Sequence, residues 1–198
     1  TAGGSTSILL ASAACIMKGT ELENYEPKGP AVWRKFAQLL PLHTEDLKTG
    51  IIVQACNRDE YDHAVECAGG SFIEVGGDKG ATVRELENAY DPERVAAYYY
   101  TLKSNSGLPL EVYVEIAHKM GAPVILDACG APPPKDGKCP FIAIGVDLVS
   151  YSGGKEVAGP NNSGILIGRK DLVKLAHLQS YPFEGVGRPG KMSRETIV

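Results

Sequence analysis

Ser150-Tyr-Ser-Gly-Gly-Lys155-Glu-Val-Ala-Gly-Pro160 sets a lysine among glycines, directly after an apolar run over residues 145–150 that predicts a buried strand. A second run with strand character follows over residues 163–168. Upstream, Pro123-Val-Ile-Leu-Asp127 ends another apolar strand with an aspartate. A pyridoxal-phosphate site requires these two groups, because the lysine forms a Schiff base with the aldehyde and the carboxylate pairs with the pyridinium nitrogen.

The rest of the chain alternates short strand and helix patterns without an internal repeat. Strand patterns cover residues 50–54, 71–75 and 95–101, and helix patterns cover residues 8–17, 30–40, 59–68, 82–90, 110–120 and 171–179. This alternation predicts an α/β fold with a mostly parallel sheet and helices on both faces. In such open sheets ligands bind at the C-terminal ends of the strands, so we expect Asp127 and Lys155 to converge there.

Composition narrows the class of protein. The chain has 198 residues, of which 43% are apolar and 22% charged, and this suits one globular domain. Its formal net charge of -4 gives no reason to expect nucleic acid or an anionic membrane as a partner. No apolar run approaches the roughly 20 residues of a membrane span. The five cysteines are scattered, which predicts reduced thiols in a cytoplasmic protein.

The opening Thr1-Ala-Gly3-Gly4-Ser5-Thr6 runs straight into the first helix pattern. Glycines let the backbone approach a ligand, and the N–H groups and dipole at a helix N-terminus favour a phosphate. A simple Ser or Thr helix cap is the alternative. Because Asp127 and Lys155 are also present, we favour phosphate binding by Gly3, Gly4 and Ser5. Ser152, three residues before the lysine, is placed to join them.

Three other motif interpretations fail. Ser152-Gly-Gly-Lys155 suggests a nucleotide P-loop, but Glu156 stands where that motif needs Ser or Thr. The run from Gly185 to Gly190 matches the dinucleotide fingerprint by letter, but it follows no strand pattern and contains a proline. A zinc site from Cys56, His63 and Cys67 lacks the usual ligand spacing, so we expect no metal site.

Seven motifs spread over the whole chain share the pattern of one enzyme group. They are Thr1-Ala-Gly-Gly-Ser5, Tyr61-Asp-His63, Ala68-Gly-Gly-Ser-Phe-Ile-Glu-Val-Gly76, Val124-Ile-Leu-Asp-Ala128, Tyr151-Ser-Gly-Gly-Lys155, Gly159-Pro-x-x-x-Gly164-Ile-Leu-Ile-Gly-Arg-Lys-Asp-Leu172 and Pro182-Phe-Glu-Gly-x-Gly-Arg-Pro189. Together they resemble the selenocysteine-synthase-like group of pyridoxal-phosphate enzymes, which has the aspartate-aminotransferase fold (fold type I). Within that group the chain is most similar to the D-glucosaminate-6-phosphate ammonia-lyase branch.

The resemblance implies a role for each candidate residue. Lys155 becomes the Schiff-base lysine, Asp127 the pyridinium partner, and Gly3, Gly4, Ser5 and Ser152 the phosphate site. A residue between Cys56 and His63 should cover the cofactor ring, with His63 one option and a structural histidine equally plausible. Arg188 is the candidate ligand for an anionic group of the substrate.

The sequence departs from the group's pattern at two places. Related enzymes often continue Ala-Ala-Gln or Ala-Ala-Glu after the strand-end aspartate, whereas this chain has Ala128-Cys129-Gly130. Glu156 and Ala158 stand in a loop where relatives often carry a basic residue. The differences put in question which residue binds an anionic group of the substrate and whether the protein has full activity.

The resemblance also implies how the protein is organised. Residues 1–198 are expected to be the large pyridoxal-phosphate-binding domain of a longer polypeptide, with an N-terminal arm and a C-terminal small domain outside this sequence. Members of the group form homodimers or higher homo-oligomers with active sites at subunit interfaces.

The leading hypothesis is a pyridoxal-phosphate-dependent lyase acting on an amino acid or amino sugar acid. Such an enzyme would remove the Cα proton, eliminate a β-substituent and release a keto acid and ammonia. Two alternatives stay open: a selenium transferase acting on seryl-tRNA, against which the acidic charge balance argues, and a non-catalytic assembly subunit with the same fold.

Overall fold

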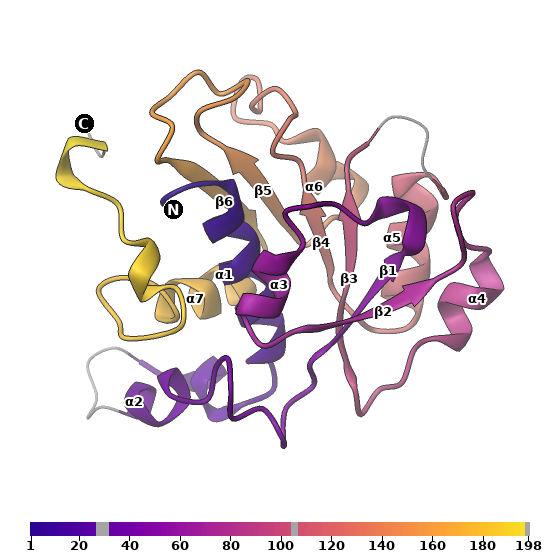
Figure 1. Cartoon of the computed structure of the whole chain (residues 1–198), viewed down its shortest axis with the longest axis horizontal. Helices are drawn as coiled ribbons and strands as arrows, with labels where there is room; N and C mark the ends of the chain where they lie inside the picture. The colour runs from indigo at the N-terminus through magenta and orange to yellow at the C-terminus, as the bar shows by residue number, and fades with distance from the viewer. Residues whose placement is uncertain (27–31, 104–106, 197–198) are drawn as a thin grey trace.

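A six-stranded sheet organises the chain, for which a computed structural model describes residues 1–26, 32–103 and 107–196 (Figure 1). The strand order is β2-β1-β3-β4-β5-β6. The bounds are Gly50–Gln54 for β1, Ser71–Val75 for β2, Val95–Thr101 for β3, Val124–Asp127 for β4, Leu148–Ser152 for β5 and Gly164–Gly168 for β6. Strands β1 to β5 pair in parallel and β6 pairs antiparallel with β5, so the predicted mostly parallel α/β sheet is confirmed.

Seven helices connect and cover the strands in the described part of the chain. They are α1 (Gly4–Ile16), α2 (Val32–Ala37), α3 (His63–Cys67), α4 (Val83–Asn88), α5 (Leu110–Lys119), α6 (Pro140–Ile144) and α7 (Lys170–Leu178). Helices α1, α3 and α7 lie on one face of the sheet, and α4 and α5 lie on the other (Figure 1). Helices on both faces were predicted and are confirmed.

Alternating side chains divide the core between the two faces. Ile51 and Val53 belong to the core under α1, and Ile52 between them belongs to the core under α5. The same alternation separates Tyr99 from Tyr98, and both are fully buried. Strands buried on both faces carry near-continuous apolar runs, which explains why these segments were recognisable in the sequence.

The register of the central strands aligns three polar residues. Thr101 at the end of β3 pairs with Asp127 at the end of β4, and Asp127 pairs with Ser150 in β5. Ile125 and Leu148, two residues earlier on their strands, pack in the core with α1. Because side chains two apart on a strand share a face, the polar side chains point toward the side that α1 covers.

Several predicted boundaries are wrong by a few residues. Helix α1 begins at Gly4 rather than Ile8, and α3 is confined to His63–Cys67. Strand β5 starts later than residue 145, because Gly145 ends the unpredicted helix α6 in a left-handed conformation with φ 109°. The predicted helix over residues 30–40 corresponds in part to α2, with residues 30 and 31 outside the described ranges.

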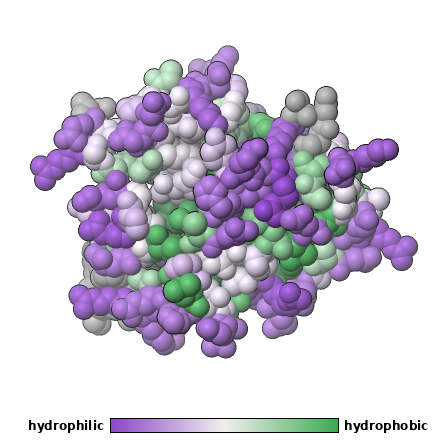
Figure 2. Space-filling model, viewed as in Figure 1, coloured by the Kyte–Doolittle hydropathy of each residue, from purple (hydrophilic) through white to green (hydrophobic). Residues whose placement is uncertain are grey.

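On the face shown in Figure 2 hydrophilic side chains prevail, with smaller hydrophobic areas between them. None of the described helices combines the length and the apolar character needed to cross a membrane.

Candidate active site

A cavity of about 270 Å³ opens at the C-terminal ends of β3, β4 and β5. Its volume is close to the lower end of the range of small-molecule sites, about 300–1,000 Å³. Five predicted site residues line it: Gly4, Ser5, Asp127, Ser152 and Lys155. Gly3 is the N-cap residue, directly before the start of α1 at Gly4. The predicted convergence of the strand-end aspartate with the glycine-loop lysine is therefore what the geometry shows.

Asp127 supplies a buried negative charge to this cavity. The residue is only 7% exposed, and its Oδ1 accepts the N–H of Cys129 at 2.9 Å. No Lys, Arg or His of the described residues forms an ion pair with it. A buried carboxylate is costly unless an opposite charge or hydrogen-bond donors compensate it. The site therefore fits a cationic group such as a protonated ring nitrogen.

The N-terminus of α1 supplies a place for an anion. The first turn of a helix leaves N–H groups without partners, and Gly3 provides no side chain to cap them. Gly3 has φ 144°, a conformation that favours glycine. Ser5 is exposed beside this turn and Ser152 ends β5 at the same cavity. These groups suit a phosphate.

Lys155 lies in the turn that joins β5 to β6. Its side chain is exposed and its Nζ lies 5.4 Å from the centroid of the Tyr61 ring. Within the described ranges no carboxylate forms an ion pair with this lysine. The amine is therefore accessible to an aldehyde in the cavity.

Cys129 packs between Asp127 and the start of α1. A Cβ added to Gly4 would lie 2.5 Å from Cys129 Sγ, so a side chain at this helix start would force the sulfur or the helix to shift. Burial raises the pKa of the Cys129 thiol to about 12, and the Asp127 carboxylate adds to that shift. The thiol is therefore protonated near neutral pH. In this chain Cys129 occupies the position two residues after the strand-end aspartate.

The lining of the cavity also includes Asp59, Tyr61 and Lys103, to which the sequence assigned no role. Tyr61 falls in the segment from Cys56 to His63 that was expected to cover the ring, and its motif was noted, so this signal was present. Lys103 had no signal, because it follows β3 in a loop without a recognisable pattern. Its Nζ lies 3.0 Å from Asp59 Oδ2.

Besides Gly3, two other candidate positions, His63 and Arg188, do not line this cavity. His63 is exposed and its Nδ1 lies 2.9 Å from the carbonyl oxygen of Glu60, so Tyr61 rather than His63 faces Lys155. Arg188 packs its guanidinium 4.8 Å from the centroid of the Tyr181 ring and lies 3.5 Å from a carboxylate oxygen of Glu184. Its role toward a substrate stays a prediction.

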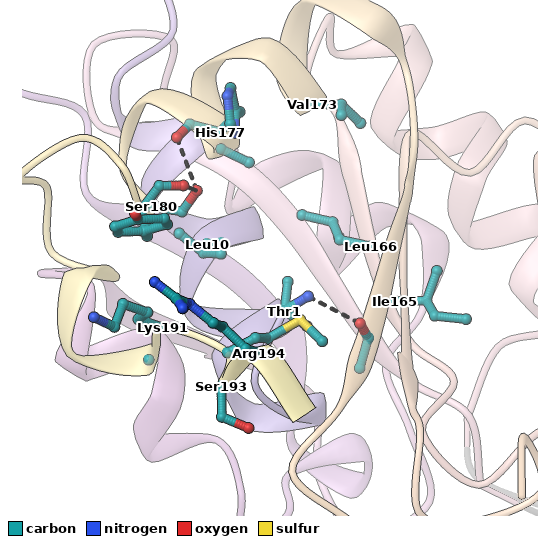
Figure 3. A pocket seen from close by; sticks show the side chains of 15 residues that line it. Thr1, Leu10, Ile165, Leu166, Val173, His177, Ser180, Lys191, Ser193 and Arg194 are labelled. Atoms are coloured by element: carbon teal, nitrogen blue, oxygen red, sulfur yellow. Dashed lines mark hydrogen bonds between the residues drawn. The ribbon is translucent and has the colours of Figure 1, made fainter. Parts of the chain in front are cut away.

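A larger cavity of about 770 Å³ lies on the other side of α1 and contains none of the predicted residues. Figure 3 shows Ile165 and Leu166 of β6 on one side and Lys191 and Arg194 of the C-terminal segment on the other. Its lining is mostly apolar, and the described residues that form it include no carboxylate. The smaller cavity is the candidate active site, because it holds the charged groups at the strand ends. No three His, Cys, Asp or Glu residues of the described part are arranged to hold a metal ion.

No family model matches the sequence, but several known proteins are similar to it. The chain is 33% identical over 138 residues to a 5'-C-glycyluridine monooxygenase-decarboxylase of Streptomyces sp, a match over 68% of this chain and 33% of that protein. It is 30% identical over 139 residues to D-glucosaminate-6-phosphate ammonia lyase of Salmonella typhimurium, over 68% of this chain and 35% of that one. The chain is 27% identical over 160 residues to L-seryl-tRNA(Sec) selenium transferase of Salmonella paratyphi A, a match over 63% of this chain and 34% of that protein.

A solved structure of D-glucosaminate-6-phosphate ammonia-lyase matches all of this chain with a TM-score of 0.80 and 27% identity. The chain belongs to the selenocysteine-synthase-like group of pyridoxal-phosphate enzymes. It spans about a third of the curated relatives and 49% of the solved structure. The group's cofactor fits the residues present, since Asp127, Lys155 and the start of α1 offer the three groups that its ring nitrogen, aldehyde and phosphate require.

Proposed function

We propose that this chain carries the cofactor site of a pyridoxal-phosphate-dependent lyase acting on an amino acid or amino sugar acid. The observation that carries the proposal is that Asp127 and Lys155 line one cavity at the N-terminus of α1. When bound, pyridoxal phosphate supplies an electron sink for the bonding pair left at the substrate's Cα. A non-catalytic assembly subunit would not require Asp127 and Lys155 to line the same cavity, so their arrangement argues against that alternative.

Each residue of the site has a distinct task in this proposal. Lys155 holds the cofactor through its Nζ and, once substrate has taken its place, removes the Cα proton as general base. Asp127 keeps the ring nitrogen protonated, because a close opposite charge favours the charged form by about 1–3 pKa units. Ser5, Ser152 and the first N–H groups of α1 hold the phosphate. Tyr61 covers the cavity beside Lys155.

The substrate class follows from elimination chemistry and from the relative that is an ammonia lyase. After the Cα proton is removed, a β-substituent leaves and hydrolysis of the enamine yields a keto acid and ammonia. The test uses the full-length protein and a panel of 2-amino acids and sugar amino acids, with release of ammonia and keto acid as readouts. Turnover that disappears in Lys155→Ala supports the proposal, and no turnover across the panel contradicts it.

Oxidative decarboxylation is a second candidate, favoured by the 33% identity to a monooxygenase-decarboxylase. The same panel separates the two reactions. Elimination releases ammonia without consuming dioxygen, whereas the second candidate consumes dioxygen and releases carbon dioxide.

Selenium transfer to a seryl-tRNA is supported by the 27% identity to a selenium transferase. The formal net charge of -4 argues against it, because binding to RNA phosphates needs a positively charged surface. A gel shift of the full-length protein with seryl-tRNA tests this alternative directly.

The organisation of the whole protein belongs to the same proposal. Residues 1–198 would form the large cofactor-binding domain of a homodimer or higher homo-oligomer, completed by an N-terminal arm and a small domain. A cytoplasmic location is part of the proposal, supported by five cysteines that form no disulfide. Light scattering on the full-length protein measures the oligomeric state.

A further inference from the structure

Tyr61 has little packing of its own to fix its position. It lies between a short 3-10 helix at Ala55–Asn57 and α3, and its side chain is 52% exposed. Its ring forms part of the cavity wall, and Lys155 Nζ lies over the face of this ring at 5.4 Å from the centroid. The backbone of its segment must therefore be held by other contacts if the ring is to stay beside the lysine.

Asp59 provides one of these contacts. Its Oδ1 accepts the N–H of Tyr61 at 3.2 Å, and its Oδ2 faces Lys103 Nζ at 3.0 Å. The Asp59 N–H in turn donates to Oδ2 of Asp62, which also binds Arg58 Nε. The carboxylate of Asp59 thus links the Tyr61 backbone to a cation from a different segment.

Lys103 comes from the chain that leaves the end of β3. Besides pairing with Asp59, its ammonium group donates to the carbonyl oxygen of Arg58. The two contacts secure two successive residues just before Tyr61. Strand β3 is the neighbour of β4, whose last residue is Asp127. Lys103 therefore connects the segment that carries Tyr61 to the end of β3, which lies beside Asp127 at the end of β4.

The ion pair is partly shielded from water, which strengthens it. The Asp59 side chain is 17% exposed and that of Lys103 33% exposed. Burial alone would raise the pKa of Asp59, but the Lys103 ammonium and the Tyr61 N–H outweigh it and leave the pKa below its ordinary value. The Asp59 carboxylate is therefore charged at neutral pH.

We propose that Asp59 and Lys103 are positioning residues that hold the Tyr61 ring against the cofactor site beside Lys155. The inference rests on the proposed function, because its purpose is to fix the aromatic wall of the cavity around the bound cofactor. Neither residue needs to touch the reacting atoms for this role.

The first test needs no cofactor. Amide hydrogen exchange of the full-length protein, followed by mass spectrometry, reports the protection of residues 58–62. We expect these amides to exchange up to about fivefold faster in Lys103→Met. A partly exposed ion pair contributes up to about 1 kcal/mol, which corresponds to that change in the opening equilibrium. Lys103→Arg restores the protection. The control is Lys119→Met, which removes the ion pair between Lys119 Nζ and Glu87 Oε1 (2.7 Å) on the other face of the sheet. This control should leave the exchange rates of residues 58–62 unchanged.

The second test uses the cofactor-loaded protein. The circular dichroism of the bound cofactor reports how firmly its surroundings are fixed. We expect this signal to weaken in Lys103→Met and Asp59→Asn, but not in Lys119→Met. In a Tyr61→Ala background Lys103→Met should weaken it no further, because the two substitutions then act through the same side chain.

Three results would overturn the inference. Lys103→Met could match Lys119→Met in both measurements, or its effect could add fully to that of Tyr61→Ala. It could also raise KM for anionic substrates with exchange and dichroism unchanged, which would make Lys103 a substrate ligand. A protein that attaches no cofactor to Lys155 contradicts the proposed function, while the exchange measurement still decides the link from Lys103 to Tyr61.

Discussion

Asp127 lies directly beside Ser150 in the parallel register of β4 and β5. Strand β5 continues only to Ser152, and Lys155 follows three residues later. The lysine loop therefore starts at the end of β5, beside the end of β4 that carries the carboxylate. This relationship explains how two residues far apart in the sequence come to line one cavity, and it makes the chemistry of each testable separately.

Replacing Asp127 by Asn should remove the charge and keep the fold. An amide oxygen can still accept the N–H of Cys129, which Asp127 Oδ1 now accepts at 2.9 Å. We expect removal of the Cα proton to slow by about 10- to 1,000-fold, corresponding to the loss of 1–3 pKa units at the ring nitrogen. Deuterium exchange at Cα of bound amino acids measures it. The control Asp46→Asn changes an exposed aspartate, and an equal effect there would contradict the assignment.

Gly4→Ala tests the close contact between α1 and Cys129. The added Cβ would lie 2.5 Å from Cys129 Sγ, so we expect overpacking to lower the free energy of unfolding by about 1–3 kcal/mol. It should also weaken cofactor binding by displacing the helix start. Cys129→Ala removes the obstructing sulfur, so the double variant should regain most of the loss in urea unfolding. Full additivity of the two substitutions would mean that the contact is not the cause.

The structure also explains how much of the site was visible in the sequence. Asp127, Ser152 and Lys155 were recognisable because each lies at or shortly after the end of an apolar strand, and strand ends meet at one edge of a parallel sheet. The extension of α1 back to Gly4 was missed because Gly and Ser disfavour helix interiors, whereas the first turn tolerates them. Lys103 and Asp59 come together only through the segments that follow two different strands, and no local pattern encodes such a contact.

The stability of the protein should fall at alkaline pH because of Cys15. Burial raises the pKa of this thiol, with the Asp147 charge adding to the shift. Above about pH 8.5 the unfolded chain loses this proton and the folded protein keeps it, so the unfolded state binds fewer protons. The free energy of unfolding then decreases by up to about 1.4 kcal/mol per pH unit. Denaturation between pH 7.5 and 10 should show a shallower decrease for Cys15→Ala, and an unchanged slope would contradict the expectation. Exposed Cys67→Ala is the control.

Asp147 should matter for stability but not for the cofactor. It precedes β5 at the opposite end of the sheet, where its carboxylate accepts the N–H of Val124 at 2.8 Å and pairs with His118 and Arg169. We expect Asp147→Asn to lower the free energy of unfolding by about 1–3 kcal/mol, because a buried hydrogen-bonded group loses partners. The control Asp171→Asn breaks a partly exposed pair with Arg169 and should cost less than about 1 kcal/mol. Loss of cofactor attachment in Asp147→Asn would contradict the expectation that this end of the sheet acts independently of the cofactor site.

The most direct measurement is the mass of the full-length protein after borohydride reduction with pyridoxal phosphate present, followed by peptide mapping of the adduct. The account predicts a single reduced pyridoxyl group on Lys155, absent from Lys155→Ala and retained in Lys103→Met. An adduct spread over surface lysines, or none, would contradict the assignment of this cavity as a cofactor site.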